Sequence, residues 1–373
     1  MKKNKLILAF SCLVLSACST YSKSESTDPH NINIGILPSI SGLGDRSFND
    51  AAFSGVLRAA TEYDIHFNFI QPESDDRVLP KLTEMAKSHE YDLIFVMSGG
   101  DAHVDAIIDV NTHFPEQRIS HIDSLLDLPN VSALQTKWQE QTFFTGIIAG
   151  LGTISDMPLV NPIHNKIGMI IGEDVMIMRQ GLLGYMAGAY LVNPDVDIVY
   201  EFSDTYRDQA ITYLMASQMF DSGIDFILTI TGGAAPGVYS AAHSHNRYAF
   251  ATGASQNFIE PYHIIATGYR SVSDLVFNEI EALIEGRWAD GLHLSGIVEG
   301  TVGLDTFQSN VVIPDHIQAA IDLSYDMIMT GELVVPATFD ELDDWVLANG
   351  PYFEHFRDPL QQHPLPEAPV EGD

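Results

Sequence analysis

Residues 34–49 read Ile34-Gly-Ile-Leu-Pro-Ser-Ile-Ser-Gly-Leu-Gly-Asp-Arg-Ser-Phe-Asn49. The first four residues form a short apolar run, which predicts a buried β-strand, and the glycines and serines after it predict a turn. The segment 49–63 then has apolar side chains at the i, i+3 and i+4 spacing of an amphipathic helix, at Ala52, Phe53, Val56, Leu57 and Ala60. A strand, a turn and a helix in this order predict one βα unit of a parallel sheet.

The same alternation continues along the chain. We expect further strands at 65–70, 93–97, 119–122, 131–134, 166–171, 196–202, 226–230, 248–251 and 264–267, and an extended segment at 297–304. We expect helices at 80–89, 104–110, 139–151, 178–191, 208–222, 272–285, 314–330 and 340–347. This order predicts an α/β fold class with doubly wound parallel sheets, and the chain length favours two lobes over one core.

The first residues indicate export. Three lysines within the first five residues precede an apolar run at 6–15, and Leu15-Ser-Ala-Cys18 follows. This order indicates a secretory signal peptide at 1–17, and the run is shorter than the about 20 residues of a spanning helix. Leu15-Ser-Ala-Cys18 resembles the lipobox of bacterial lipoproteins, in which the cysteine is acylated after cleavage. The alternative is an ordinary signal peptide that contains a cysteine by chance.

Cysteine content and charge restrict the possible partners. Cys12 and Cys18 are the two cysteines, and Cys12 leaves with the signal, so we expect no disulfide and no cysteine-based metal site. The net charge is −32, and loss of the three signal lysines changes it to −35. Such a chain should repel nucleic acid and anionic lipid, which leaves acyl chains on Cys18 as the attachment to a membrane. The polar segment 20–33 predicts a flexible tether, and the proline-rich acidic segment 361–373 predicts a disordered tail.

A ligand site is expected beyond the carboxyl ends of the strands, where open parallel sheets bind their ligands. The segments that follow the predicted strands are rich in Gly, Ser and Asp, and are 38–49, 98–101, Asp123, 172–174, 231–237 and 252–255. Ser47-Phe48-Asn49 has two interpretations. Ser47 or Asn49 caps the following helix, or Phe48 forms a flat wall for a ring beside the N–H donors of the helix.

Enzyme motifs are absent from the sequence. It contains no Walker A loop, no His-Glu-x-x-His and no Gly-x-Ser-x-Gly. His243 and His245 point apart if they lie on a helix, so we expect rim residues and no metal. Gly232-Gly233 is weak evidence for a phosphate loop, and Asp343-Asp344 is interpreted as a solvated face. We therefore expect no enzyme activity and no cofactor.

Several motifs occur in the order found in one known family. They are Asp45-Arg-Ser-Phe-Asn49, Pro129-Asn-Val131, the helix at 139–150, Lys166-Ile-Gly168, Gly184-Tyr-Met-Ala-Gly188 and Ile328-Met-Thr-Gly-Glu332. With the lipobox, they resemble the basic membrane protein family of ABC-transporter solute-binding lipoproteins, whose best-understood members are purine nucleoside receptors. The resemblance runs from about residue 34 to 336.

The resemblance implies a type I periplasmic-binding-protein fold with a multi-strand hinge between two lobes. It implies that Phe48 stacks on the ligand ring, and that Asn49 and Asp123 help to read the base. The expected divisions are a signal peptide at 1–17, a lipidated cysteine and tether at 18–31, one lobe at 32–138 plus about 268–300, the other at 139–267 plus about 301–336, and an acidic helix with a disordered tail at 337–373.

Other positions depart from the family pattern. Ser39, Ser255 and Ser271 stand where family members have Asp, Asp and Lys, and Arg270 lies beside Ser271. A second stacking Phe corresponds to Gly181. Either Trp138 or Tyr185 is expected to replace that Phe, and Gly233 is a further expected ligand contact. The charged clamp on a ribose is therefore expected to be lost.

The expected function is that of a solute receptor for an ABC importer, with a nucleoside or related ring compound as ligand. Its expected partners are the permease and ATPase subunits and a membrane reached through the lipid anchor, on the periplasmic face of the cell envelope. The alternative is an envelope or surface lipoprotein that keeps the fold without a transport role, and Ser19 after the cysteine slightly favours it. A hydrolase that uses Asp123 and a nearby histidine is the third hypothesis.

Overall fold

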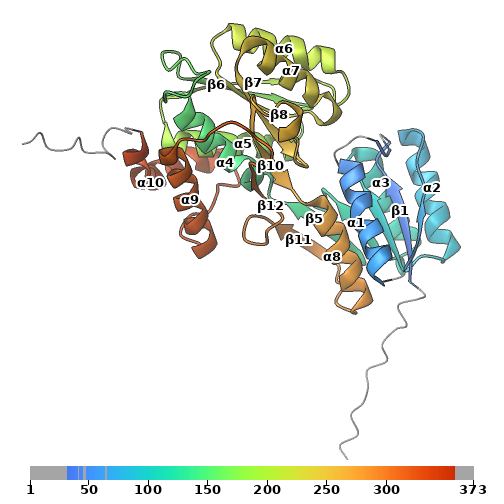
Figure 1. The fold of residues 1–373 in the computed structure, drawn as a ribbon. Helices are drawn as coiled ribbons and strands as arrows, with labels where there is room; N and C mark the ends of the chain where they lie inside the picture. Colours follow the sequence, from blue (N-terminus) through green and yellow to red (C-terminus); the bar gives the residue numbers. More distant parts are fainter. Residues whose placement is uncertain (1–31, 41, 45–47, 64, 358–373) are drawn as a thin grey trace, which may run out of the picture.

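The computed structural model describes residues 32–357, except 41, 45–47 and 64. It contains two six-stranded sheets, each the centre of one lobe (Figure 1). The strands of the first sheet are β1 (Asn33–Pro38), β2 (His66–Phe69), β3 (Leu93–Met97), β4 (Ile119–Ile122), β5 (Val131–Thr136) and β11 (Gly291–Ser295). Those of the second sheet are β6 (Lys166–Ile171), β7 (Asp197–Phe202), β8 (Phe226–Ile230), β9 (Tyr248–Gly253), β10 (Ile264–Arg270) and β12 (Val302–Asp305).

Both sheets have the same strand order. The first runs β11-β5-β4-β3-β1-β2 and the second β12-β10-β9-β8-β6-β7. All pairs are parallel except β10 with β12. The predicted α/β class with doubly wound parallel sheets is therefore confirmed. In each sheet the order reverses beside the first strand, and such a switch point leaves a crevice at the carboxyl ends of the strands.

Helices cover both faces of each sheet. The first lobe has α1 (Phe48–Tyr63) beside α8 (Val272–Ile284), and α2 (Asp75–Ser88) beside α3 (Asp101–His113). The second lobe has α4 (Trp138–Gly152), α5 (Met176–Val192), α6 (Gln209–Asp221), α7 (Ala235–His245), α9 (Asp315–Thr330) and α10 (Leu342–Asn349). Within the described residues, none of these helices is long and apolar enough to cross a bilayer.

The continuous apolar runs are explained by this double coverage. Along β3, Leu93, Phe95 and Met97 belong to the core formed with α1 and α8. Ile94 and Val96 belong to the opposite core, formed with α2 and α3. Because successive side chains point to opposite faces, a strand with a core on each side needs an apolar residue at every position.

The chain crosses between the lobes at three places. It leaves the first sheet between β5 and α4, returns to the first lobe between β10 and α8, and leaves again between β11 and β12. The crossings lie side by side at the hinge, where the backbone N–H of Lys137 donates to the Ser295 carbonyl at 2.9 Å and that of Ser271 to the Thr301 carbonyl at 2.8 Å. The multi-strand hinge of a type I periplasmic-binding-protein fold is thus present.

Three local predictions were wrong. The helix expected from residue 80 begins at Asp75, with Pro80 inside it, because flanking apolar contacts outweigh the one backbone hydrogen bond that proline lacks. The segment 235–237, expected as loop, is the first turn of α7, where Pro236 is tolerated. Of the extended segment expected at 297–304, only residues 302–304 are extended, as part of β12, whereas 297–300 form a turn, and the strand β11 before it was not predicted.

The C-terminal acidic helix is present as α10, and structure continues beyond it. Phe353 and Phe356 are buried in the core of the second lobe, and Arg357 Nε donates to the Val192 carbonyl at 2.8 Å. These contacts attach residues 350–357 to the end of α5. The predicted disordered tail at 361–373 and residues 20–31 of the tether predicted at 20–33 lie outside the described residues. The last two tether residues differ from the prediction, since Ile32 is buried and Asn33 begins β1.

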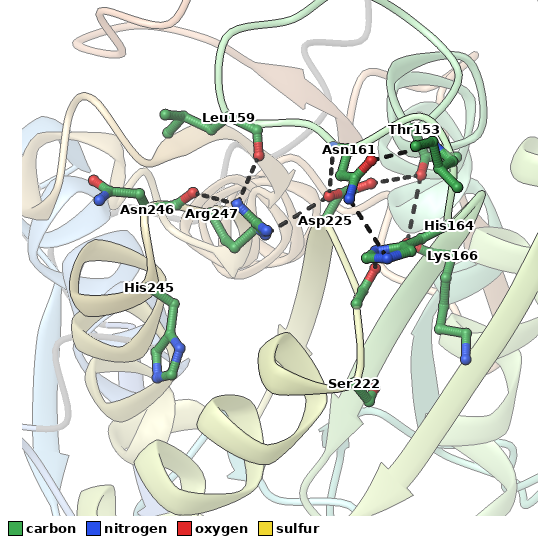
Figure 2. A network of polar contacts seen from close by, with 12 residues as sticks. Thr153, Leu159, Asn161, His164, Lys166, Ser222, Asp225, His245, Asn246 and Arg247 are labelled. Carbon is green, nitrogen blue, oxygen red and sulfur yellow. Dashed lines mark hydrogen bonds and ion pairs between the residues drawn. The ribbon is translucent and has the colours of Figure 1, made fainter.

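A buried polar network fastens the connection between α4 and β6 (Figure 2). The fully buried Asp225 carboxylate accepts from the Thr153 hydroxyl at 3.0 Å and from the Asn161 backbone N–H at 3.0 Å. Arg247 Nε lies 3.7 Å from the same carboxylate. Burial raises the pKa of Asp225. Asp225 directly precedes β8, so this network lies at the amino ends of the strands, away from the edge where a ligand site is expected.

The helices α4 and α5 pack with backbone against backbone. A Cβ added at Gly184 would lie 2.0 Å from the Gln139 carbonyl oxygen, and one at Gly188 would lie 2.0 Å from the Phe143 carbonyl oxygen. At Gly146 of α4, an added Cβ would lie 2.2 Å from the Tyr185 carbonyl oxygen. The Gly184-Tyr-Met-Ala-Gly188 motif therefore has a structural reason, because only glycine permits this approach.

We expect Gly188→Ala to lower the free energy of unfolding by about 3 kcal/mol, because the added methyl group must push the helices apart. The measurement is denaturant unfolding of the chain from Ser19 onward. Gly100→Ala is the matched control, since a Cβ there meets nothing closer than 3.4 Å and the change only exchanges the N-cap residue of α3, so its effect should stay within about 1 kcal/mol. Equal effects of the two substitutions would contradict the packing argument.

Candidate functional site

A cavity of about 190 Å³ lies at the hinge, where the carboxyl ends of both sheets meet. Its lining comes from both lobes and from two of the crossings. Its walls are mainly apolar and carry a few polar groups, which is the composition of small-molecule sites. The lining residues are Phe48, Ala51, Asp123, Trp138, Gln141, Met178, Tyr206, Ile230, Gly232, Thr252, Gly253, Ala254, Arg270 and Val272.

An ion pair lies in the wall of this cavity. Arg270, at the end of β10, reaches Asp123 of the first lobe through both terminal nitrogens. Its Nη1 donates to Asp123 Oδ2 at 3.1 Å. The pair is well shielded from water, since the side chains are only 4% and 15% exposed. Asp123 holds φ at +61°, a left-handed conformation that aspartate tolerates better than most residues and that aims its carboxylate at the hinge.

Two aromatic rings flank the same guanidinium. The Arg270 Cζ lies 4.8 Å from the ring centre of Trp138 and 5.5 Å from that of Phe48. Both distances are within the range of a cation–π contact. Phe48 opens α1 and Trp138 opens α4, so one wall belongs to the first lobe and the other to a crossing. Four predicted site residues, namely Phe48, Asp123, Trp138 and Arg270, are thus brought together.

Trp138, and not Tyr185, lies at the position of the missing Phe. A Cβ built at Gly181 lies 3.9 Å from Trp138 Cε3 and 2.6 Å from Ile230 Cδ1, so these side chains fill the space beside the glycine. Tyr185 is fully buried in the core of the second lobe and does not line the cavity. Burial raises its pKa well above the usual value.

Asn49 and Ser39 do not line the cavity, but they hydrogen-bond to each other beneath its wall. The buried Asn49 side chain accepts from the Ser39 backbone N–H at 3.3 Å and donates to the Ser39 hydroxyl at 2.9 Å. These bonds tie the end of β1 to the start of α1. They hold the turn that presents Phe48 to the cavity.

The other predicted residues lie around the cavity mouth. Ser255 and Ser271 line an adjoining, more open recess of about 410 Å³, which shares Gly253, Arg270 and Val272 with the cavity. The Ser271 hydroxyl is bonded to Asp274. Gly233 is not part of the lining, although its neighbour Gly232 is. Cys18 lies outside the described residues.

Sequence reasoning missed several lining residues. One of them is Tyr206, from the loop after β7. Its ring packs on Gly172, where an added Cβ would lie 2.1 Å from the Tyr206 ring. Burial, with the nearby Glu173 carboxylate, raises the pKa of Tyr206 to about 12, so its hydroxyl stays protonated. Gln141 of α4 was also missed. No local pattern marked either residue, because each reaches the cavity through packing between distant segments.

Two buried histidines lie behind the site in the first lobe. His121 Nε2 donates to the Ser98 carbonyl at 2.6 Å, and the His103 ring lies 3.2 Å from the Pro38 carbonyl. Burial lowers the pKa of both, and that of His121 to about 4. Both rings are therefore neutral at pH 7, and their hydrogen bonds hold the carboxyl ends of β3 and β1. Among the described residues, no cluster of histidine, cysteine and carboxylate side chains is suited to a metal ion.

We expect His121 to make the protein acid-sensitive. Its folded pKa of about 4 lies below the unfolded value of about 6.5, so between these values the unfolded chain binds a proton that the folded chain does not. Stability should therefore fall as the pH drops from 6.5 to 4, by about 3 kcal/mol from this group. Denaturant unfolding should show a flatter pH profile in His121→Asn than in the wild type. The exposed His66→Asn should keep the wild-type slope, and equal slopes in all three proteins would contradict the prediction.

Comparisons with known proteins agree with this geometry. The family model described as ABC transporter substrate-binding protein, PnrA-like, matches residues 37–338. An uncharacterized lipoprotein of Pyrococcus horikoshii is 27% identical over 283 residues, which is 73% of this chain and 68% of the relative. Basic membrane protein B of Borreliella burgdorferi is 25% identical over 314 residues, 80% of this chain and 88% of the relative.

A solved structure shares the fold. The crystal structure of an ABC transporter system solute-binding protein from Aeropyrum pernix superposes with a TM-score of 0.72 at 24% identity. The match covers 86% of this chain and 98% of that one. The two-lobed fold is therefore shared with this solute-binding protein over most of the chain.

Proposed function

Because the chain belongs to the family of PnrA-like ABC transporter substrate-binding proteins, we propose that it binds a nucleoside or related ring compound and delivers it to an ABC importer. One observation carries the ligand class. Phe48 and Trp138 place two aromatic faces on one hinge cavity, beside the Asp123–Arg270 pair. Aromatic faces bind flat rings by stacking, and the ion pair supplies polar atoms at the ring edge.

Binding in this proposal is coupled to closure of the lobes. The two lobes are taken here as 32–138 with about 268–300, and 139–267 with about 301–336, the second together with α10 and residues 350–357 that pack on it. The cavity draws its lining from both, so a bound ring would contact Phe48 on one side and Met178 or Ile230 on the other. A ligand that contacts both lobes only when they are closed shifts the population towards the closed state. The receptor therefore needs no chemical turnover.

The proposed location is the periplasmic face of a membrane in the cell envelope. The signal at 1–17 is removed, Cys18 carries the acyl chains, and the net charge of −35 that remains disfavours attachment by lipid headgroups. The partners are then the permease and ATPase subunits of an importer. The relatives from Pyrococcus and Borreliella, named as lipoprotein and membrane protein, support this proposal.

We expect a nucleoside at about 100 times its dissociation constant to stabilise the chain from Ser19 onward by about 2.7 kcal/mol, visible as a thermal shift. Phe48→Ala should reduce or abolish the shift by removing a stacking face. Leu57→Ala, on the same helix but half-exposed and outside the cavity lining, is the control and should keep it. A screen of nucleosides, bases and simple sugars in which only sugars stabilise the wild type would overturn the ring ligand.

We expect Cys18→Ala to release the protein from the membrane fraction, because the acyl anchor can no longer form. Cell fractionation measures this, and Cys12→Ala, within the same signal, should remain membrane-bound. A Cys18→Ala protein that stays in the membrane fraction would refute the lipid anchor.

A role without transport is the second candidate. The serines at 39, 255 and 271 favour it, since a neutral hydrogen bond is weaker than a charge-assisted one. Separation of inner and outer membranes distinguishes the candidates. A receptor for an importer should be found where the importer is, and exclusive recovery in the outer membrane would favour the second candidate.

A further inference from the structure

Three polar atoms of the cavity-lining residues have no hydrogen-bond partner among the described residues. They are Arg270 Nε, Trp138 Nε1 and Gln141 Oε1. All three residues are more than nine-tenths buried. A buried polar atom without a partner costs about 1–3 kcal/mol, so three on residues that line one cavity favour a ligand that completes them.

The three atoms define a pattern. The Arg270 and Trp138 nitrogens carry hydrogen and can only donate, whereas the Gln141 oxygen can only accept. Gln141 is held in this orientation because its Nε2 donates to the Gly268 carbonyl at 2.8 Å. A complementary ligand therefore presents two acceptors and one donor.

The Asp123 carboxylate does not add a demand for N–H donors on the ligand. Both of its oxygens already accept from Arg270, and the two charges neutralise each other. The guanidinium uses its two terminal nitrogens for this pair, which leaves the edge that contains Nε for another acceptor. A free carboxylate would favour a ring rich in N–H donors, but this one is engaged by the protein itself.

We propose that the cavity selects flat rings with an oxo–NH–oxo edge, that is, imide-type rings such as uracil, over rings in which an amino group replaces an oxo group. The proposal rests on the proposed function, since it assumes a ring ligand in this cavity. Arg270 and Trp138 donate to the two oxo groups, and Gln141 accepts from the ring N–H between them. In this arrangement Phe48 supplies the stacking face and Trp138 the donor, because an indole N–H lies in the plane of its own ring and reaches a ligand ring edge to edge.

The test compares two nucleosides that differ by one such exchange. Uridine has an oxo group and a ring N–H where cytidine has an amino group and a ring acceptor. Calorimetric titration of the wild-type chain from Ser19 onward should give at least about a tenfold lower Kd for uridine, as expected for one mismatched buried hydrogen bond. Inosine and adenosine differ by the same exchange on a purine, and we expect inosine to have the lower Kd.

Two variants locate the preference. Trp138→Phe keeps an aromatic face and removes the N–H, and Arg270→Lys keeps the charge and removes the planar fork. Each should weaken uridine binding several-fold and bring the two dissociation constants closer together. Met178→Leu is the control, because it changes an apolar wall and should affect both nucleosides alike. Thermal unfolding of each variant confirms that it is folded.

The outcomes separate the two proposals. A wild-type protein that binds both nucleosides equally, or cytidine more tightly, overturns the oxo preference and leaves the ring receptor standing. A uridine preference that survives unchanged in folded Trp138→Phe and Arg270→Lys overturns the assignment to these residues. A protein that binds no nucleoside or base overturns both. If a variant does not fold, the ratio of the cytidine and uridine dissociation constants of the wild type still tests the oxo preference.

Discussion

The parallel arrangement of the strands is the constraint on which this molecule depends. A parallel sheet must cover both faces with helices, and its strands all end at one edge. Because the two sheets share the strand order, each has a switch point and a set of loops at that edge. The three crossings hold these edges together at the hinge. The cavity is a consequence of this arrangement and requires no separate structural device.

Packing around the hinge then determines which side chains reach the cavity. Glycines let α4 and α5 touch through their backbones, which places Trp138 and Gln141 at the start of α4 against the hinge. The Ser39–Asn49 bonds hold the turn before α1 and present Phe48 from the other side. On one side of the site α4 and α5 pack backbone against backbone, and much of the remaining lining comes from the segments that follow β4, β7, β8 and β9.

The ion pair of Asp123 and Arg270 is the charged feature of the cavity. A buried Arg–Asp pair contributes little net stability, because desolvation offsets much of the attraction. Its value here lies in orientation, since it fixes a planar donor group against two aromatic rings.

The sequence by itself determined the fold class and most of the elements, because strand and helix periodicity and turn glycines are local properties of the chain. It placed Asp123 at a strand end and Phe48 at the start of a helix, whereas Trp138 and Arg270 entered through the family resemblance. Only the tertiary structure decided that Trp138 and not Tyr185 faces the cavity, that Asn49 holds Ser39, that Arg270 pairs with Asp123, and that Tyr206 and Gln141 belong to the lining. Those facts depend on contacts between segments far apart in sequence, and no local pattern encodes which of several nearby side chains the final packing will bury.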